Sequence, residues 1–353
     1  MLIDYFKNYV QTYSPYKNGA WCYEDGCIYR GLELLHRSSG EAFWLDSLIR
    51  LVDTQLSRDG TLKGYKLKDY NIDNILPGRA LLYLYEITGQ PEYLSGATTL
   101  VNQLESHPRT NSNVYWHKLH YPSQIWLDGL YMAAPFQIKY GLLHQKPKLV
   151  QDSLQQLIDA LRLTYVSTSG LYAHAYDEAR VQDWADRETG HTRAHWARSL
   201  GWLSMALVDI AELVDQKAFE PLLTTTTELL DDIASLKTQN GLWLQVIDQP
   251  ELAGNYEESS ASAMFTYSLL KAHDLRLWQG SVDGLFDNLV SNVIRMHEGK
   301  PHSMINICHV AGLGMYEGRY RDGSAQYYLS EALVDNDSKG VGPLMMALAT
   351  SQR

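Results

Sequence analysis

Apolar residues recur at spacings of three and four through most of the 353-residue chain, in stretches that follow one another in pairs. This spacing is typical of an amphipathic α-helix. Two such stretches joined by a short turn form an αα-hairpin. The sequence predicts five hairpins, at 26–37 with 41–57, 75–88 with 91–105, 124–144 with 147–165, 195–213 with 217–237, and 258–275 with 281–297.

The predicted turns contain residues that end or begin helices. Gly40 follows the first helix of one hairpin, and Gly89 and Pro91 flank the turn of the next. Pro147 begins the second helix of the third hairpin. Glycine favours the left-handed conformation that ends many helices, and proline fits the first helical turn. The sequence therefore predicts short turns within each hairpin.

The connections between hairpins are much longer than these turns. They span roughly 58–74, 106–123, 166–194, 238–257 and 298–340. Stretches 3–13 and 341–350 can pair as a sixth hairpin and close a ring. We predict an all-α fold, an (α/α)6 barrel forming a single catalytic domain over residues 1–353, with the long loops and the function on one face. An open α-solenoid is the alternative, but the hairpins lack a fixed period.

Composition argues against nucleic acid as a partner. The net charge is -11, and no run of Lys and Arg supplies a phosphate-binding surface. The chain has 24 Tyr and 9 Trp but only 6 Phe, a bias toward aromatic residues that carry a polar group and can face a wet cavity. Such residues also serve as core, so the bias only favours a sugar-binding protein.

Cys22, Cys27 and Cys308 have no spacing suited to a zinc site or a disulfide framework, which predicts free buried thiols. The N-terminal segment MLIDYFKNYVQTYS lacks a basic region followed by an apolar core. The sequence also has no run of about eighteen apolar residues. We therefore expect a cytoplasmic protein with no membrane partner.

The segment WHKLHYPSQIWLDGLYMAAPF, from Trp116 to Phe136, places Asp128 among aromatic and apolar neighbours. Asp and the adjacent Gly129 are poor residues inside a helix, and such local conflicts often mark functional sites. Apolar surroundings favour the protonated form of a carboxyl group, which suits a general acid. The alternative is a structural carboxylate bonded to Trp, Tyr or Arg.

Other polar residues lie in the long loops or near the start of a hairpin's first helix, so the topology gathers them on the same rim. They are Asp73, His174, Arg198 and Glu258. Asp73 is either a helix cap or a second carboxylate that binds hydroxyl groups and influences Asp128. Arg198 can bind a substrate carboxylate through two nitrogens, or it can pair with an acidic residue of the rim.

Histidine and tryptophan add weaker signals. His117 and His120 are spaced like metal ligands, but without a clear third ligand they predict no metal. His174 is compatible with a surface, core or catalytic position. Trp196 and Trp202 can stack on sugar rings, although tryptophan is also common between packed helices.

Six separated motifs extend from about Asp73 to Pro343. They are IDNILPGRALLYLYEITG, IWLDGLYMAAPF, LYAHAYD, HWARSLGWLSMALVD, EESSASAMFTYSL and YRDGSAQYYLSEALVDNDSKGVGPLMMA. Together they resemble the motifs of glycoside hydrolase family 105, the unsaturated uronyl hydrolases. The resemblance implies an (α/α)6 barrel that removes a Δ4,5-unsaturated uronic acid from the non-reducing end of oligosaccharides left by polysaccharide lyases.

The resemblance also implies a mechanism without a metal or cofactor. Asp128 matches the general acid/base that protonates C4 of the C4=C5 bond and activates the water that adds at C5. The resulting hemiketal opens and expels the rest of the sugar chain. Asp73 matches the second essential carboxylate. The predicted substrate-binding residues are His117, Lys118, Trp126, Met132, His174, Trp196, Arg198, Trp202 and Glu258.

The expected substrate is a small anionic oligosaccharide, unsaturated galacturonyl-rhamnose from the pectin component rhamnogalacturonan I. Unsaturated glucuronyl units of other polymers are an alternative. A sugar epimerase of the α/α toroid type would use paired histidines, which His117 and His174 can supply, but Asp128 would then lack a task. The Trp and Tyr content also permits a non-catalytic toroid that binds oligosaccharides.

Overall fold

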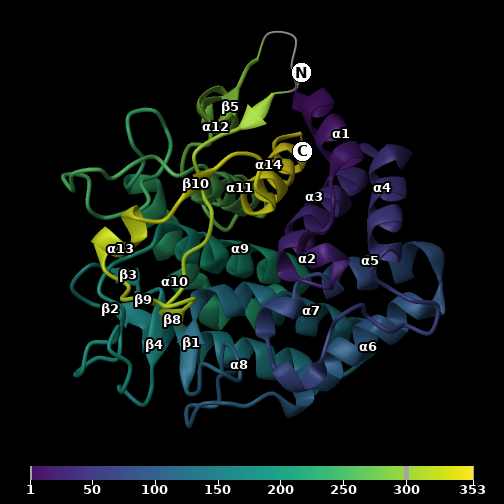
Figure 1. Ribbon diagram of the computed structural model, residues 1–353, viewed down its shortest axis with the longest axis horizontal. Helices are drawn as coiled ribbons and strands as arrows, with labels where there is room; N and C mark the ends of the chain where they lie inside the picture. The colour runs from purple at the N-terminus through teal and green to yellow at the C-terminus, as the bar shows by residue number, and fades with distance from the viewer. Residues whose placement is uncertain (1, 298–301, 353) are drawn as a thin grey trace.

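A closed inner ring of helices dominates the computed structural model, which describes residues 2–297 and 302–352 (Figure 1). Within these ranges the ring consists of α3 (Tyr23–Ser39), α5 (Gly78–Thr88), α7 (Leu127–Leu143), α9 (Ala197–Leu213), α11 (Ser259–Asp274) and α14 (Ser338–Ser351). Each helix packs against the next, and α14 packs against α3. In Figure 1 the yellow α14 accordingly lies beside the purple α3.

Outer helices pack on five of the inner helices. They are α4 (Ala42–Asp53), α6 (Pro91–Ser106), α8 (Pro147–Thr164), α10 (Gln216–Ser235) and α12 (Leu285–Val293). The N-terminal helix α1 (Leu2–Thr12) is joined to the segment before α14, because the Tyr5 hydroxyl donates to Asn336 Oδ1 at 2.7 Å. The predicted all-α toroid, closed by the two ends of the chain, is confirmed.

The helix ends follow the predicted signals. Gly40 and Gly89 end α3 and α5 in the left-handed conformation, with φ of 67° and 70°. Pro91 and Pro147 lie at the starts of α6 and α8. Proline lacks the N–H that would be unpaired there, so the sequence fixes these boundaries locally.

The prediction of a helix over 281–297 was too long. The helix α12 covers only Leu285–Val293, and Gly284 before it has a φ of 65°. After it, β5 (Ile294–Arg295) pairs with β6 (Ser303–Met304). Part of the predicted loop 298–340, residues 298–301, lies outside the described residues.

Short strands and helical turns occupy the long loops, which the helical pattern did not predict. The strand pairs are β1 (Gln124–Trp126) with β4 (Ala175–Asp177), β2 (Tyr165–Val166) with β3 (Leu171–Tyr172), β7 (Ile307–Cys308) with β10 (Leu333–Val334), and β8 (Gly314–Tyr316) with β9 (Arg319–Arg321). The short helices are α2 (Tyr16–Gly19), η1 (Leu67–Asp69), η2 (Ile72–Ile75) and α13 (Ala325–Leu329). The first residues of the predicted helix 124–144 are thus strand β1.

Glycine allows α3 and α14 to approach closely where the ring closes. A Cβ atom at Gly342 would lie 2.4 Å from the carbonyl oxygen of Cys27, and one at Gly31 would lie 2.8 Å from Cβ of Met345. Larger residues at these positions would separate the two helices. Cys27, like Cys22 and Cys308, is a buried free thiol, as predicted. In the part of the chain that the structure describes, no helix is both long and apolar enough to span a bilayer.

Candidate active site

The pairing of β1 with β4 brings His174 next to Asp128. Trp126 pairs with Ala175, and the backbone N–H of Leu127 donates to the carbonyl of His174 at 3.0 Å. Asp128 follows in the first turn of α7. The short sheet therefore fixes the histidine at the start of the helix that carries the carboxylate.

The side chains of Asp128 and His174 face each other. Asp128 Oδ2 lies 3.3 Å from His174 Nε2. Both atoms are buried and have no hydrogen-bond partner in the described chain. The Asp128 side chain is 14% exposed, whereas the His174 side chain is fully buried. Catalytic hydrogen bonds are often long or misaligned before substrate binds, so this geometry suits an acid and a residue that orients it.

Tyr328 of α13 holds the other side of the His174 ring. Its hydroxyl lies 2.8 Å from His174 Nδ1, and its ring stacks on Trp196 with the centroids 5.9 Å apart. Burial raises the pKa of Tyr328 well above its ordinary value, so the hydroxyl keeps its proton and can donate it. We did not predict a role for Tyr328 from the sequence, although it lies within the last of the six motifs.

Asp73 forms a second polar group with Lys118 and His117. Its Oδ2 lies 2.6 Å from Lys118 Nζ, and its Oδ1 lies 3.5 Å from His117 Nε2. Burial opposes ionisation of Asp73, but the charge of Lys118, the neighbouring His117 and the hydrogen bond from Lys118 together outweigh it, so the pKa lies below its ordinary value. The cap of η2 is Asn71, which accepts from the Asp73 N–H at 3.1 Å. The helix-cap interpretation of the Asp73 side chain was therefore wrong.

Trp126 links the two polar groups. One stack joins Trp126 to His117, with centroids 4.4 Å apart and planes 8° apart, and Tyr121 also stacks on the indole. The rings of Trp126 and His174 meet edge to face, with centroids 5.3 Å apart. Gly129 makes room for this arrangement, since a Cβ there would lie 3.1 Å from His117 Nδ1. The unfavourable glycine in α7 thus has a packing reason.

His117 gives the stability of the protein a pH dependence. Burial lowers the pKa of His117 to about 4, against the opposing effect of Asp73. An unfolded histidine titrates near ~6.5, so below that pH the unfolded chain takes up a proton that the folded chain does not. Stability is therefore full above about pH 6.5 and falls toward about pH 4.

We compare the free energy of unfolding of the wild type with that of His117→Asn, which has no titrating ring at this position. Between about pH 7 and about pH 4.5 the wild type should lose roughly 2–3 kcal/mol more than the variant. Urea denaturation at each pH measures it. A difference between the two proteins that stays constant with pH would contradict a buried neutral imidazole.

Arg198 is held by protein groups. Its Nε donates to Ser260 Oγ at 2.7 Å, and its Nη2 lies 3.5 Å from Glu258 Oε1 and also donates to the carbonyl of Cys308. Glu258 caps α11 by accepting from the N–H groups of Ser260 and Ala261. The Arg198 side chain is only 1% exposed. Of the two uses considered for Arg198, these contacts correspond to pairing with an acidic residue of the rim and not to binding a substrate carboxylate.

Other predicted residues occupy different positions. Met132 and Trp202 are buried, and Trp202 stacks on Tyr131 with centroids 5.3 Å apart. Across the described chain, no hydrogen bond, ion pair or ring contact joins either residue to Asp128 or Asp73. The structure therefore brings Asp128, His174 and Trp196 together, and Asp73, His117 and Lys118 together, with Trp126 between them.

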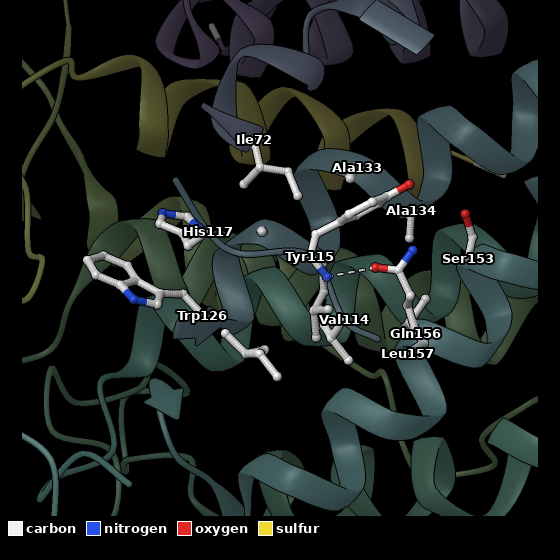
Figure 2. Close-up of a pocket in the computed structure, with 13 residues that line it drawn as sticks. Ile72, Val114, Tyr115, His117, Trp126, Ala133, Ala134, Ser153, Gln156 and Leu157 are labelled. Atoms are coloured by element: carbon white, nitrogen blue, oxygen red, sulfur yellow. Dashed lines mark hydrogen bonds between the residues drawn. The ribbon is translucent and has the colours of Figure 1, made fainter. Parts of the chain in front are cut away.

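A small cavity lies behind His117 and Trp126 (Figure 2). Its volume is ≈ 20 Å³, room for about one water molecule. Apolar side chains make up most of its wall, and the Tyr115 N–H donates to Gln156 Oε1 at one side at 3.0 Å. A sugar ring does not fit in a space of this volume.

The histidines HKLH do not converge on a common point. His117 stacks on Trp126, whereas His120 lies against Tyr121 with centroids 4.1 Å apart. Within residues 2–297 and 302–352, no group of three or more His, Cys, Asp or Glu side chains is arranged to hold a metal ion.

Comparison with known proteins identifies relatives along the whole chain. The model of Glycosyl Hydrolase Family 88 matches residues 3–353. A glycoside hydrolase from family 105 of C. acetobutylicum ATCC 824 has 36% identity and a TM-score of 0.90, over 94% of this chain and 93% of its own. Protein Atu3128 of Agrobacterium fabrum is 46% identical over 229 residues, 62% of this chain and 98% of the relative. The unsaturated rhamnogalacturonyl hydrolase YesR of Bacillus subtilis is 24% identical over 265 residues, covering 72% of each chain.

A helical toroid with a partly exposed carboxyl group beside aromatic rings is suited to an enzyme that acts on sugars. The matches define the relationship further: the chain belongs to the unsaturated uronyl hydrolases of glycosyl hydrolase families 88 and 105. The resemblance seen in the sequence motifs is confirmed, and the protein is a glycosidase.

Proposed function

We propose that this enzyme removes a Δ4,5-unsaturated uronic acid, most specifically unsaturated galacturonic acid linked to rhamnose, by adding water to the C4=C5 bond. The observation that carries the proposal is the buried pair of Asp128 Oδ2 and His174 Nε2, 3.3 Å apart at the start of α7. One carboxyl group, oriented from behind and partly exposed in front, provides what protonation of an enol ether requires.

The reaction begins when Asp128 gives its proton to C4. Protonation leaves positive charge on C5, shared with the ring oxygen. A water molecule then adds to C5 and returns a proton to the carboxylate of Asp128, so the acid is regenerated. The product is a hemiketal, which opens and releases the remaining sugar from C1. No covalent enzyme intermediate is needed, unlike a retaining glycosidase with two carboxylates at the anomeric carbon.

The group of Asp73 and Lys118 is suited to binding the uronate. The Lys118 side chain is 20% exposed and carries the charge that an anionic sugar needs, while Asp73 holds it in place at 2.6 Å. Trp126 and His117 are buried against each other, so the flat ring left for the apolar face of a sugar is that of the partly exposed Tyr121, which stacks on Trp126. Arg198, buried and bonded to Ser260 and Glu258, has its guanidinium group 5.3 Å from the centre of the Trp196 ring and supports that ring.

The identity of the sugar is tested by a panel of unsaturated disaccharides. Similarity to the rhamnogalacturonyl hydrolase YesR supports unsaturated galacturonyl-rhamnose. Ultraviolet absorbance of the conjugated uronate should fall fastest with this compound. Faster loss with an unsaturated glucuronyl disaccharide would reassign the substrate. No loss with any compound would contradict addition of water to the C4=C5 bond as the reaction of this enzyme. We expect the enzyme to act in the cytoplasm on short imported fragments.

Tyr328→Phe should lower kcat about tenfold, the usual effect of losing one hydrogen bond in the transition state. Donation from the hydroxyl to His174 Nδ1 leaves the imidazole proton on Nε2, facing Asp128. Phenylalanine keeps the stack on Trp196 but loses this donor. The pH at which kcat is half-maximal should also move, which a purely structural role would not cause.

The adjacent Tyr327→Phe is the matched control for that substitution. Its hydroxyl accepts from the Gly312 N–H at 3.0 Å and does not contact His174. We expect its pH profile of kcat to match that of the wild type. If Tyr328→Phe also kept the wild-type kcat and pH profile, the proposed role of Tyr328 would be wrong.

A further inference from the structure

A polar cavity of ≈ 320 Å³ lies at the opposite end of the helical ring from Asp128. Lys139 and Asp209 are among the residues that line it. Lys139 comes eleven residues after Asp128 in α7, and Asp209 comes eleven residues after Arg198 in α9. At 1.5 Å per residue, the cavity is about 16 Å from the rim described above. It is therefore a separate feature of the molecule.

Asp209, at the inner wall of this cavity, is saturated with donors. It is completely buried. Its Oδ1 lies 2.6 Å from Lys271 Nζ and accepts from the Tyr267 hydroxyl, and its Oδ2 lies 2.7 Å from Arg79 Nη2. This carboxylate therefore needs no further partner.

The carboxylates nearer the mouth are also occupied. Glu33 Oε2 lies 2.8 Å from Arg30 Nη1, and its Oε1 accepts from Arg37 Nε at 3.0 Å. Glu86 Oε1 lies 2.6 Å from Lys139 Nζ, and its Oε2 lies 3.7 Å from Arg37 Nη2. Glu212, the remaining carboxylate of the wall, has its Oε2 2.6 Å from Lys271 Nζ. Every carboxylate of the wall is thus paired with a cation, although the contact of Glu33 Oε2 with Arg30 is an ion pair without a hydrogen bond.

Donors, in contrast, are left over. Arg79 Nη1 and Arg30 Nε are buried and have no hydrogen-bond partner in the described chain. Their side chains are only 8% and 6% exposed. A buried donor without a partner costs free energy, and the cost is larger on a charged group. An ion-pair network that served only stability would not need to leave two guanidinium donors beside an open cavity.

We propose that this cavity is a second binding site, which takes a small oxyanion with carboxylate or phosphate oxygens. The free donors of Arg79 and Arg30 bind the oxyanion at the inner end. Lys139 and Arg37, with side chains 30% and 39% exposed, attract it at the mouth. The planar guanidinium group matches both carboxylate and phosphate oxygens, and the volume is at the low end for small-ligand pockets. This site does not depend on the proposed reaction.

Isothermal titration calorimetry of the full chain tests the site, with inorganic phosphate and malonate as separate probes. Arg79→Lys keeps a positive charge beside Asp209 but removes the free nitrogen, so the Kd should rise about tenfold. Lys139→Gln, a surface change that leaves the core intact, should also weaken binding. Lys118→Gln, at the other end of the ring, is the matched control and should leave the Kd unchanged. Circular dichroism melting checks that each variant folds.

Each result is decisive. Heat of binding that Arg79→Lys and Lys139→Gln reduce and Lys118→Gln does not would support the site. The probe that binds more tightly would then show whether phosphate or carboxylate is preferred. Absence of binding up to tens of millimolar would overturn the proposal. Binding that only Lys118→Gln weakens would also overturn it, because the anion would then occupy the rim near Asp128.

Discussion

Replacing Asp128 with asparagine should lower kcat on the unsaturated disaccharide by at least about 100-fold, the usual contribution of general acid–base catalysis. Asparagine keeps the shape of the side chain beside His174 but cannot give a proton to C4 or accept one from water. The KM should change little, because the amide still fills the same space. Loss of ultraviolet absorbance over time measures both constants.

Asp183→Asn is the control for this substitution. The side chain of Asp183 is 78% exposed and pairs with Arg187 on the surface, so the turnover of Asp183→Asn should equal that of the wild type. Turnover of Asp128→Asn within a few-fold of the wild type would show that another group supplies the proton.

Asp209→Asn should lower the free energy of unfolding by about 3–5 kcal/mol, as expected when one partner of a buried ion pair is removed. Burial opposes the charge of Asp209, but Lys271, Arg79 and Arg30 outweigh it and lower its pKa. The amide would leave these three buried cations without their shared counterion. The stabilisation is present above the ordinary pKa of aspartate, near ~3.9, and is lost as the pH falls below it.

Urea denaturation near neutral pH measures this effect. Asp183→Asn is again the matched change, because breaking its exposed pair with Arg187 should cost less than about 1 kcal/mol. An equally small loss for Asp209→Asn would mean that the buried cations find other partners.

The sequence was sufficient for the helices because their signals are local. Gly40 and Gly89 end helices through their own backbone conformation, and Pro91 and Pro147 begin helices for the same kind of reason. Residues 124–126 show the limit. They form a strand because they pair with 175–177, far along the chain. A strand of three residues also carries too little periodic signal to be distinguished from the long helix that follows it.

The candidate site was predictable as a set of residues more than as an arrangement. The predicted order of the hairpins put Asp128 and His174 on the same rim, because each lies near the start of an inner helix or in a loop beside it. Sequence alone could not decide how Arg198 is used, since its partners Ser260, Glu258 and Cys308 come from two other segments. The same reason hid the hydroxyl of Tyr328, which contacts His174 from a distant loop. The cap at Asn71 is a local contact with the Asp73 N–H, but Asn71 and Asp73 are equally suited to capping by residue type.

The far cavity had no sequence signal. Arg79 and Lys139 are each the one basic residue of a largely apolar helix, and such residues usually lie on a solvated face or form one ion pair. Only the packed ring shows that α3, α5, α7 and α9 direct several of them toward one space.

The central claim is that water adds across the C4=C5 bond, and labelling with heavy water tests it most directly. Unsaturated galacturonyl-rhamnose is converted by the wild-type enzyme in D2O, and mass spectrometry with NMR locates the deuterium in the released uronate. Hydration by Asp128 predicts loss of the ultraviolet absorbance during catalysis and one deuterium at C4. Release of rhamnose together with a uronate that keeps its C4=C5 double bond and has no deuterium at C4 would contradict hydration. Cleavage would then occur at the anomeric carbon.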